Sequence, residues 1–157
     1  MAIELGVNSY VTLEDANAHF ENRLDVAAWD EADEDTRSKA LISATMLIES
    51  FEWTGVAVSE SQPLAFPRVG EYFDPRVGYV IAMDGVPSKI IKATIELAYH
   101  LLNNDGLLDE TGGVVNLSLG PIQLTDISTP PKMPSWIHRT IRPLLLNRGS
   151  RAWYRAN

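Results

Sequence analysis

The sequence predicts a mainly α-helical protein: a small bundle of about four helices with a β-hairpin insertion and an extended C-terminal arm. Three observations predict this fold. Four segments carry apolar residues at helical spacing, two short apolar runs flank Gly120–Pro121, and the chain after Leu146 has few apolar residues to bury. At 157 residues the chain is long enough for one domain with a core. We expect a helical domain over residues 1–146, with the hairpin at about 114–125, and an arm over residues 147–157.

The first two helices are predicted from their caps and apolar stripes. Thr12 is a suitable N-cap for the first helix, and either Asp33 or Asp35 for the second. The first stripe is Leu13, Ala16, Phe20 and Leu24; the second is Ala40, Leu41, Ala44, Leu47, Ile48 and Phe51. Trp29 and Trp53 follow these helices, where an amphipathic ring commonly closes the end of a core.

Residues 53–86 are predicted to be mostly irregular. Their density of glycine and proline excludes a long helix. Seven large apolar residues in the same stretch favour a loop that is packed on the core over a free linker: Leu64, Phe66, Tyr72, Phe73, Tyr79, Val80 and Ile81.

The second half of the chain adds two helices and the hairpin. Pro87 suits the first turn of a third helix, which the Asn104–Gly106 turn ends. Residues 114–119 and 122–125 are the two strands of the hairpin. Ser135 is the expected cap of a fourth helix, in which Trp136 is the first apolar anchor and Pro143 produces a kink or an early end.

Charge divides the chain into an acidic body and a basic end. The net charge is −8, and the only cations in residues 1–62 are Arg23, Arg37 and Lys39. From Lys132 to Asn157 there is no Asp or Glu. This distribution excludes wrapping of nucleic acid by the whole surface, although the C-terminal arm can still bind nucleic acid locally.

The sequence shows no motif for catalysis, metal binding or membrane insertion. It lacks cysteine, a glycine-rich phosphate loop and a nucleophile elbow, and His19, His100 and His138 lie on three different predicted helices. The acidic run at residues 30–35 lacks the glycine and the distal glutamate of a calcium loop. No signal peptide and no membrane span are readable. We therefore expect no enzyme, no cofactor, no metal and no membrane, with an uncharacterised small enzyme as the least favoured alternative.

The C-terminal arm has the composition of a binding segment. Trp153 lies close to the end of the chain, where a short segment cannot bury it alone, and tryptophan, tyrosine and arginine dominate binding hot spots. The candidate partner-binding residues are Arg148, Arg151, Trp153, Tyr154 and Arg155. The alternative is a tail that folds back on its own acidic body.

Several short motifs occur in an order that resembles a known family. They are residues 10–16 at the first helix, 39–45 in the second, 53–55 after it, 64–68 in the loop and 86–87 before the third helix. With the hairpin at 115–124, this order resembles the bacteriophage head–tail connector (adaptor) proteins. Many of these are catalogued as DnaT-like single-stranded-DNA-binding proteins. Phe66 stands where the family more often has tryptophan, which is a departure from the pattern.

The resemblance implies a structural protein of the virion neck, assembled in the host cytoplasm. Such proteins form a ring, commonly a dodecamer, that docks on the portal protein, joins it to the next connector or tail protein, and leaves a channel. Genomic DNA passes through the channel without sequence-specific binding. The arm is then the portal-binding segment, and Phe66, Pro67 and Arg68 are a possible subunit interface, with a local salt bridge as the alternative role of Arg68.

The family's catalogue name gives an alternative function, single-stranded-DNA binding as a replication accessory protein. This function requires aromatic rings that stack on bases beside a basic groove. Trp153, Tyr154 and the arginines around them supply these groups, whereas the acidic body would repel a strand laid across it.

Overall fold

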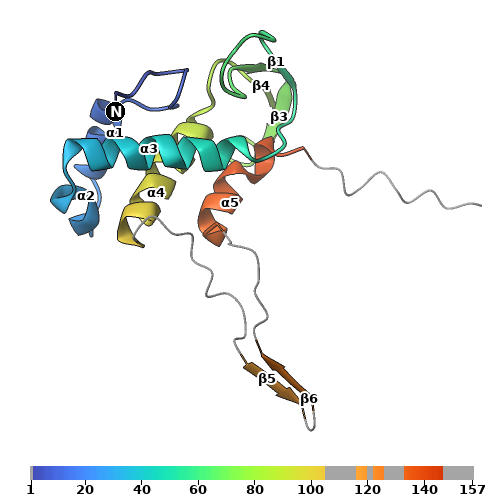
Figure 1. The fold of residues 1–157 in the computed structure, drawn as a ribbon. Coiled ribbons are helices and arrows are strands. Elements are labelled where there is room, and N and C mark those ends of the chain that lie inside the picture. The colour runs from blue at the N-terminus through green and yellow to red at the C-terminus, as the bar shows by residue number, and fades with distance from the viewer. Residues whose placement is uncertain (1, 105–115, 120–121, 126–132, 147–157) are drawn as a thin grey trace, which may run out of the picture.

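The computed structural model describes residues 2–104, 116–119, 122–125 and 133–146 (Figure 1). Two long helices form its centre, α3 and α4, which pack against each other. The shorter helices α2 and α5 pack on α4, and α1 packs on α3. In chain order the helices are α1 (Leu13–Phe20), α2 (Ala27–Glu31), α3 (Glu34–Glu49), α4 (Ser88–Asn103) and α5 (Ser135–Ile141), followed by the 3-10 turn η1 (Arg142–Leu144).

The core lies where α3, α4 and α5 meet. Leu41 and Ile48 on α3, and Ile90 and Leu97 on α4, are each seven residues apart, which places the members of each pair on the same side of their helix. The fully enclosed aliphatic side chains include Leu41, Ile48, Ile90, Leu97, Ile137, Ile141 and Leu144. Trp29 and Trp53 are 1% and 6% exposed, which confirms their predicted place in the core.

Two predicted caps are present. The Thr12 hydroxyl accepts a hydrogen bond from the Asp15 amide at 3.1 Å, and Asp33 Oδ1 accepts one from the Thr36 amide at 2.7 Å. Asp33, rather than Asp35, is therefore the cap of α3. The predicted extension of the first apolar stripe to Leu24 is wrong, because α1 ends at Phe20 and Leu24 is 92% exposed.

Residues 53–86 differ from the sequence prediction. They contain strand β1 (Val56–Ala57) paired with β2 (Arg68–Val69), and the hairpin of β3 (Glu71–Asp74) and β4 (Tyr79–Ala82). The protein is therefore mixed α/β, and the prediction of a mainly α-helical bundle was wrong in this region. Strands of two to four residues are too short to show an apolar alternation, and the glycines that exclude a helix lie in their turns.

The predicted second hairpin is present, formed by β5 (Asn116–Leu119) and β6 (Ile122–Thr125), with Leu119 opposite Ile122. The fourth predicted helix is α5, but no side chain caps it, so the cap assigned to Ser135 was wrong. Pro143 lies in η1 and ends the α-helix early, as expected.

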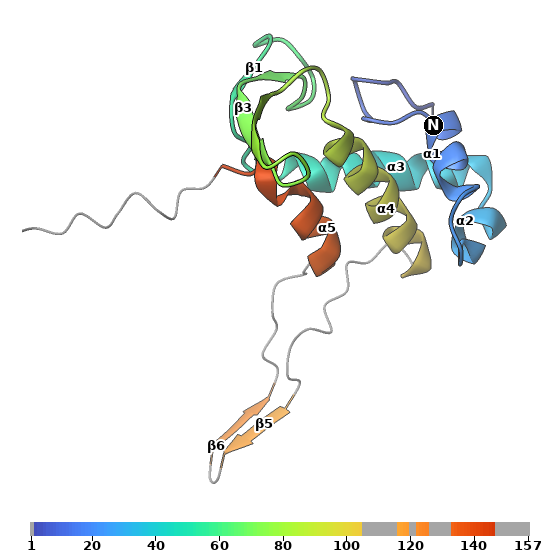
Figure 2. The same ribbon diagram turned by 180° about the vertical axis from the view of Figure 1, so that it is seen from behind.

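The described chain ends beside the C-terminal end of α3. Leu145 pairs with Trp53 in an antiparallel bridge. The Thr54 amide donates to the Leu144 carbonyl, and the Leu146 amide to the Glu52 carbonyl, both at 2.9 Å. Viewed from either side, α1 lies toward the opposite end of α3 (Figures 1 and 2). The start of the C-terminal segment is thereby fixed to the body, far from α1.

Candidate functional site

One face of α5 and η1 carries an aromatic ring and two cations. Ile137 and Ile141 are one helical turn apart and have 0% exposed surface, so they form the buried side of α5. Trp136, Arg139 and Arg142 recur every three residues away from that side, and all three are exposed. We call these three residues the α5 face.

Trp136 is not the apolar anchor that the sequence predicts. Its side chain is 42% exposed, whereas the next residue, Ile137, is fully buried. The reason is spacing: Ile137, Ile141 and Leu144 form the stripe that packs inward, and Trp136 lies one residue outside it. Sequence reasoning therefore missed an exposed ring that the spacing of the following isoleucines could have revealed.

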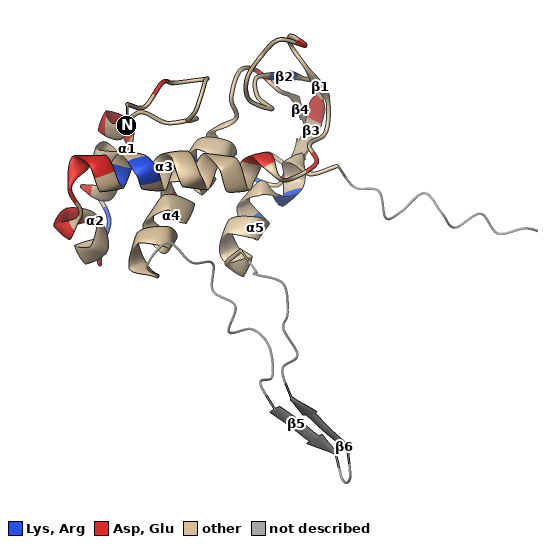
Figure 3. Ribbon diagram, in the orientation of Figure 1, with Lys and Arg blue, Asp and Glu red and all other residues tan. Residues whose placement is uncertain are grey.

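The α5 face is also where positive charge is available. Most other cations of the body bind partners within the chain. Four form ion pairs: Arg23 with Glu96, Lys39 with Asp35, and both Arg76 and Lys89 with Asp74. Arg37 and Arg68 donate hydrogen bonds to backbone carbonyls. Arg139 and Arg142 have no ion pair within the described ranges. Figure 3 shows Asp and Glu gathered around α2 and the start of α3, and Lys and Arg on α5.

This arrangement suits an anionic, aromatic ligand. An exposed indole ring can stack on a base or another planar group, and nearby guanidinium groups can bind phosphate or carboxylate oxygens. No Asp or Glu occurs from residue 132 onward, so the segment that carries the α5 face adds no negative charge of its own. The α5 face can therefore bind a ligand electrostatically, although the body as a whole is acidic.

The candidate residues of the arm lie outside the described residues. These are Arg148, Arg151, Trp153, Tyr154 and Arg155. The structure shows where their segment begins, at the exposed Leu146, four residues after Arg142. The arm thus continues directly from the basic end of the α5 face.

The segment predicted as a possible subunit interface is tied mainly to its own chain. Phe66 is 1% exposed and packs edge-on against the rings of Tyr10 and Trp53. Arg68 donates to the carbonyls of Thr54 and Gly55, at 2.8 and 2.6 Å, and forms none of the salt bridges found in the described residues. Pro67 and part of Arg68 remain accessible, so a subunit contact here stays a prediction for those two residues.

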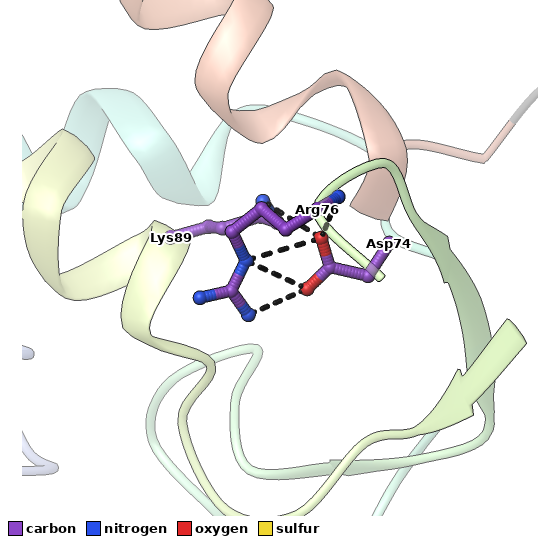
Figure 4. Close-up of polar contacts among 3 residues, drawn as sticks. All are labelled: Asp74, Arg76 and Lys89. Carbon is purple, nitrogen blue, oxygen red and sulfur yellow. Dashed lines mark hydrogen bonds and ion pairs between the residues drawn. The ribbon is translucent and has the colours of Figure 1, made fainter. Parts of the chain in front are cut away.

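Two charged clusters lie elsewhere and join elements of the body. Asp74 is fully buried, with Arg76 Nη2 at 2.6 Å and Lys89 Nζ at 3.6 Å from its carboxylate oxygens (Figure 4). Hydrogen bonds from Arg76 hold the pKa of Asp74 well below its ordinary value. Glu96 on α4 bonds both His19 on α1 and Arg23. Both clusters connect separate segments, which indicates a structural role.

Within the described residues, no group of three or more His, Asp or Glu side chains is arranged to hold a metal ion. None of the helices in this part of the chain has the length and apolar character needed to cross a membrane.

Comparison with known proteins places the chain in a family. A family model described as "Putative DnaT-like ssDNA binding protein" matches residues 2–156. Searches of the curated proteins and of the solved structures gave no match. The family match spans the helical body, both hairpins and the C-terminal segment. The chain therefore belongs to the family of putative DnaT-like ssDNA binding proteins.

Proposed function

We propose that this protein binds single-stranded DNA through the α5 face and the basic, aromatic segment that follows it. The observation that carries this proposal is the exposed Trp136 beside Arg139 and Arg142, on a body in which most other cations are engaged within the chain. Membership of a family described by single-stranded-DNA binding supports it. A single strand offers unpaired bases for stacking, which a duplex does not.

The charge distribution of the protein restricts where single-stranded DNA can bind. The whole chain has a net charge of −8, and its acidic body repels phosphate, so the DNA strand is confined to the basic end of the protein. The cations available there are Arg139 and Arg142, followed by Arg148, Arg151 and Arg155. If two to five of them contact phosphate, log affinity falls with log salt concentration at a slope of about −1.4 to −3.5.

Fluorescence anisotropy with a labelled oligo-dT tests this proposal. Trp136→Ala should weaken binding by roughly 5- to 150-fold, which corresponds to about 1–3 kcal/mol for one stacked base. Arg139→Gln should weaken binding and reduce the salt slope by about 0.7. The matched control is Lys92→Gln, which removes an exposed cation from α4 and should leave affinity unchanged. Absence of binding at low salt would remove the proposal.

A second candidate function is the head–tail connector of a bacteriophage neck. The order of motifs in the sequence supports it, and so does the engagement of most body cations by the chain itself, which leaves little of the body to bind DNA. In this role, copies form a ring, the arm contacts the portal, and the other side meets a connector or tail protein. Both candidate functions are binding roles without a catalytic step.

Sedimentation with a purified portal ring distinguishes the two functions. The connector function predicts co-sedimentation that is lost when residues 149–157 are deleted, with oligo-dT binding absent in both proteins. The DNA-binding function predicts oligo-dT binding and no co-sedimentation. The genes on either side provide an independent check, because portal and capsid genes upstream with tail genes downstream favour the connector.

A further inference from the structure

The hairpin of β3 and β4 has an open strand edge outside the site described above. The Met83 amide donates to the Gly70 carbonyl at 2.8 Å, in register with the pairing of the two strands. Hydrogen-bonded and non-bonded pairs alternate along an antiparallel ladder, so the backbone N–H and C=O groups of Val80 and Ala82 point away from β3. Neither amide donates to the carbonyl of another segment in the part of the chain that the structure describes. The edge of β4 is therefore available to pair with another strand.

The outer face of the same hairpin is apolar and exposed. Phe73 and Val80 are opposite each other across the hairpin, and they are 52% and 54% exposed. Ala82, two residues further along β4, is exposed as well. Edge strands are commonly protected by lysine, proline or a bulge, and the sequence of β4, Tyr-Val-Ile-Ala, contains neither lysine nor proline. An edge with this composition and with unpaired backbone groups accepts a further extended strand.

The charges at the two ends of the hairpin determine which strand fits. At the turn, the single carboxylate of Asp74 lies with two cations, Arg76 and Lys89, so this end is net positive (Figure 4). At the open end, Glu71 and Asp84 are exposed carboxylates, so that end is net negative. A strand that pairs antiparallel to β4 therefore fits best when it is negative beside the turn and positive beside the open end.

A second copy of the same hairpin has this distribution of charge. Antiparallel pairing brings the negative end of each copy to the positive turn of the other, whereas parallel pairing brings like charges together. Arg68 on the adjoining β2 does not change this result, because one cation leaves the two carboxylates of the open end with a net negative charge. We infer that two copies of this chain associate through antiparallel pairing of their β4 strands.

The outward backbone groups select the register of this pairing. With Val80 of each copy opposite Ala82 of the other, both residues donate and accept hydrogen bonds across the contact. Asp84 of each copy then lies opposite Gly78 of the other, next to the turn that carries Arg76. The two hairpins become one four-stranded sheet, which is more stable than an isolated two-stranded hairpin.

The acid-rich part of the body lies away from this edge. The β3–β4 hairpin is at one end of α3, and α1 and α2 are toward the other end (Figures 1 and 2). Asp and Glu gather around α2 and the start of α3 (Figure 3). Two copies that meet at β4 therefore keep their most acidic surfaces apart, although each chain has a net charge of −8.

The contact uses the same strand of both copies, so it is isologous and closes at a dimer. It goes beyond DNA binding and does not depend on it, since it concerns the association of the protein alone.

Sedimentation velocity of the full chain without DNA, over a series of concentrations, measures this association. Val80→Lys and Val80→Glu should each weaken the dimer by roughly tenfold, because the two Val80 side chains are diagonal neighbours on one face of the sheet. An equimolar mixture of the two variants should recover the dimer, since opposite charges then lie across the contact. The matched control is Val56→Lys on β1, where the natural valine is 71% exposed, and it should leave the dimer unchanged.

Amide hydrogen exchange followed by NMR locates the contact. The amides of Val80 and Ala82 should exchange more slowly as protein concentration rises. The amide of Phe73, which faces outward on the other edge of the hairpin, should not change with concentration.

Three outcomes would overturn the inference. The first is a chain that stays monomeric up to about 1 mM. The second is a mixture of Val80→Lys and Val80→Glu that associates no better than either variant alone. The third is a dimer in which the exchange of Val80 and Ala82 is independent of concentration, because its contact would then lie on another surface.

Discussion

The phenolic hydroxyl of Tyr10 donates a hydrogen bond to the carboxylate of Glu49, which joins the segment before α1 to the end of α3. The same hydroxyl accepts from the Phe66 amide at 3.1 Å, and the second oxygen of Glu49 accepts from the Ala65 amide at 2.8 Å. Burial, and then the bond to Glu49, raise the pKa of Tyr10 well above its ordinary value. Two side chains therefore hold three segments together.

Tyr10→Phe should lower the free energy of unfolding by about 1–2 kcal/mol, because the Phe66 amide loses its acceptor and Glu49 loses the hydroxyl donor to one of its two oxygens. Urea denaturation measures this loss. Tyr79→Phe is the matched control, since Tyr79 is 62% exposed and should be neutral. Equal midpoints for the two variants would contradict the assigned role of the hydroxyl.

Because of Asp74, the free energy of unfolding should depend on pH in the acidic range. Its folded pKa is lowered by Arg76, so the unfolded chain, with a pKa near 3.9, takes up its proton first as the pH falls. The stabilising contribution is complete above about pH 5 and decreases below it toward the lower folded pKa. The gap in urea midpoint between the natural protein and Asp74→Asn should narrow over that range. Asp84→Asn, at an exposed carboxylate, is the control; a gap that stays constant with pH would refute the assignment.

Gly55 and Gly78 form a matched pair with φ of 75° and 77°. A Cβ at Gly78 meets open space, whereas one at Gly55 would lie 2.5 Å from the Val69 carbonyl oxygen. Gly78→Ala should cost about 1 kcal/mol through backbone conformation alone. Gly55→Ala should exceed this by about 1–3 kcal/mol because of the added overlap. Thermal or urea unfolding gives both values, and equal losses would argue against the close approach of β1 and β2.

Arg68→Lys should destabilise the protein by about 1.5–3 kcal/mol. The ammonium group of lysine cannot reproduce the hydrogen bonds that the guanidinium group donates to the carbonyls of Thr54 and Gly55. Arg139→Lys, at an exposed arginine, should be neutral. If Arg68→Lys instead preserved stability and weakened self-association, Arg68 would belong to a subunit interface.

Trp136→Ala should cost about 1 kcal/mol or less, since the ring is substantially exposed. Ile137→Ala should cost about 2–5 kcal/mol, because it opens a cavity between α5 and α4. Urea unfolding of the two neighbours therefore reports which side of α5 faces the core. A larger loss for Trp136→Ala would reverse the assignment of the α5 face.

The sequence was sufficient for the helices with strong local signals. Thr12, Asp33 and Pro87 mark the starts of α1, α3 and α4, because caps and prolines act through their nearest neighbours along the chain. The β5–β6 hairpin was also readable from two apolar runs around a Gly–Pro turn.

Features that depend on distant contacts could not be predicted in the same way. Strands β1 and β2 are held together by the hydrogen bonds of Arg68 and by close packing at Gly55. Neither interaction produces a periodic pattern in the amino-acid sequence. The five-residue α2 is too short for periodicity to show. Trp136 was predicted to pack in the core, as tryptophan commonly does. Its exposure follows from the orientation of α5, which is set by the burial of Ile137 and Ile141.

The attachment of the chain end beside α3 has a mechanical consequence. Tension applied to the C-terminal segment first meets the antiparallel backbone bonds between residues 144–146 and 52–54. A pull on the chain end therefore acts on the backbone after α3 as well as on η1 and α5, so its force is divided between two parts of the body.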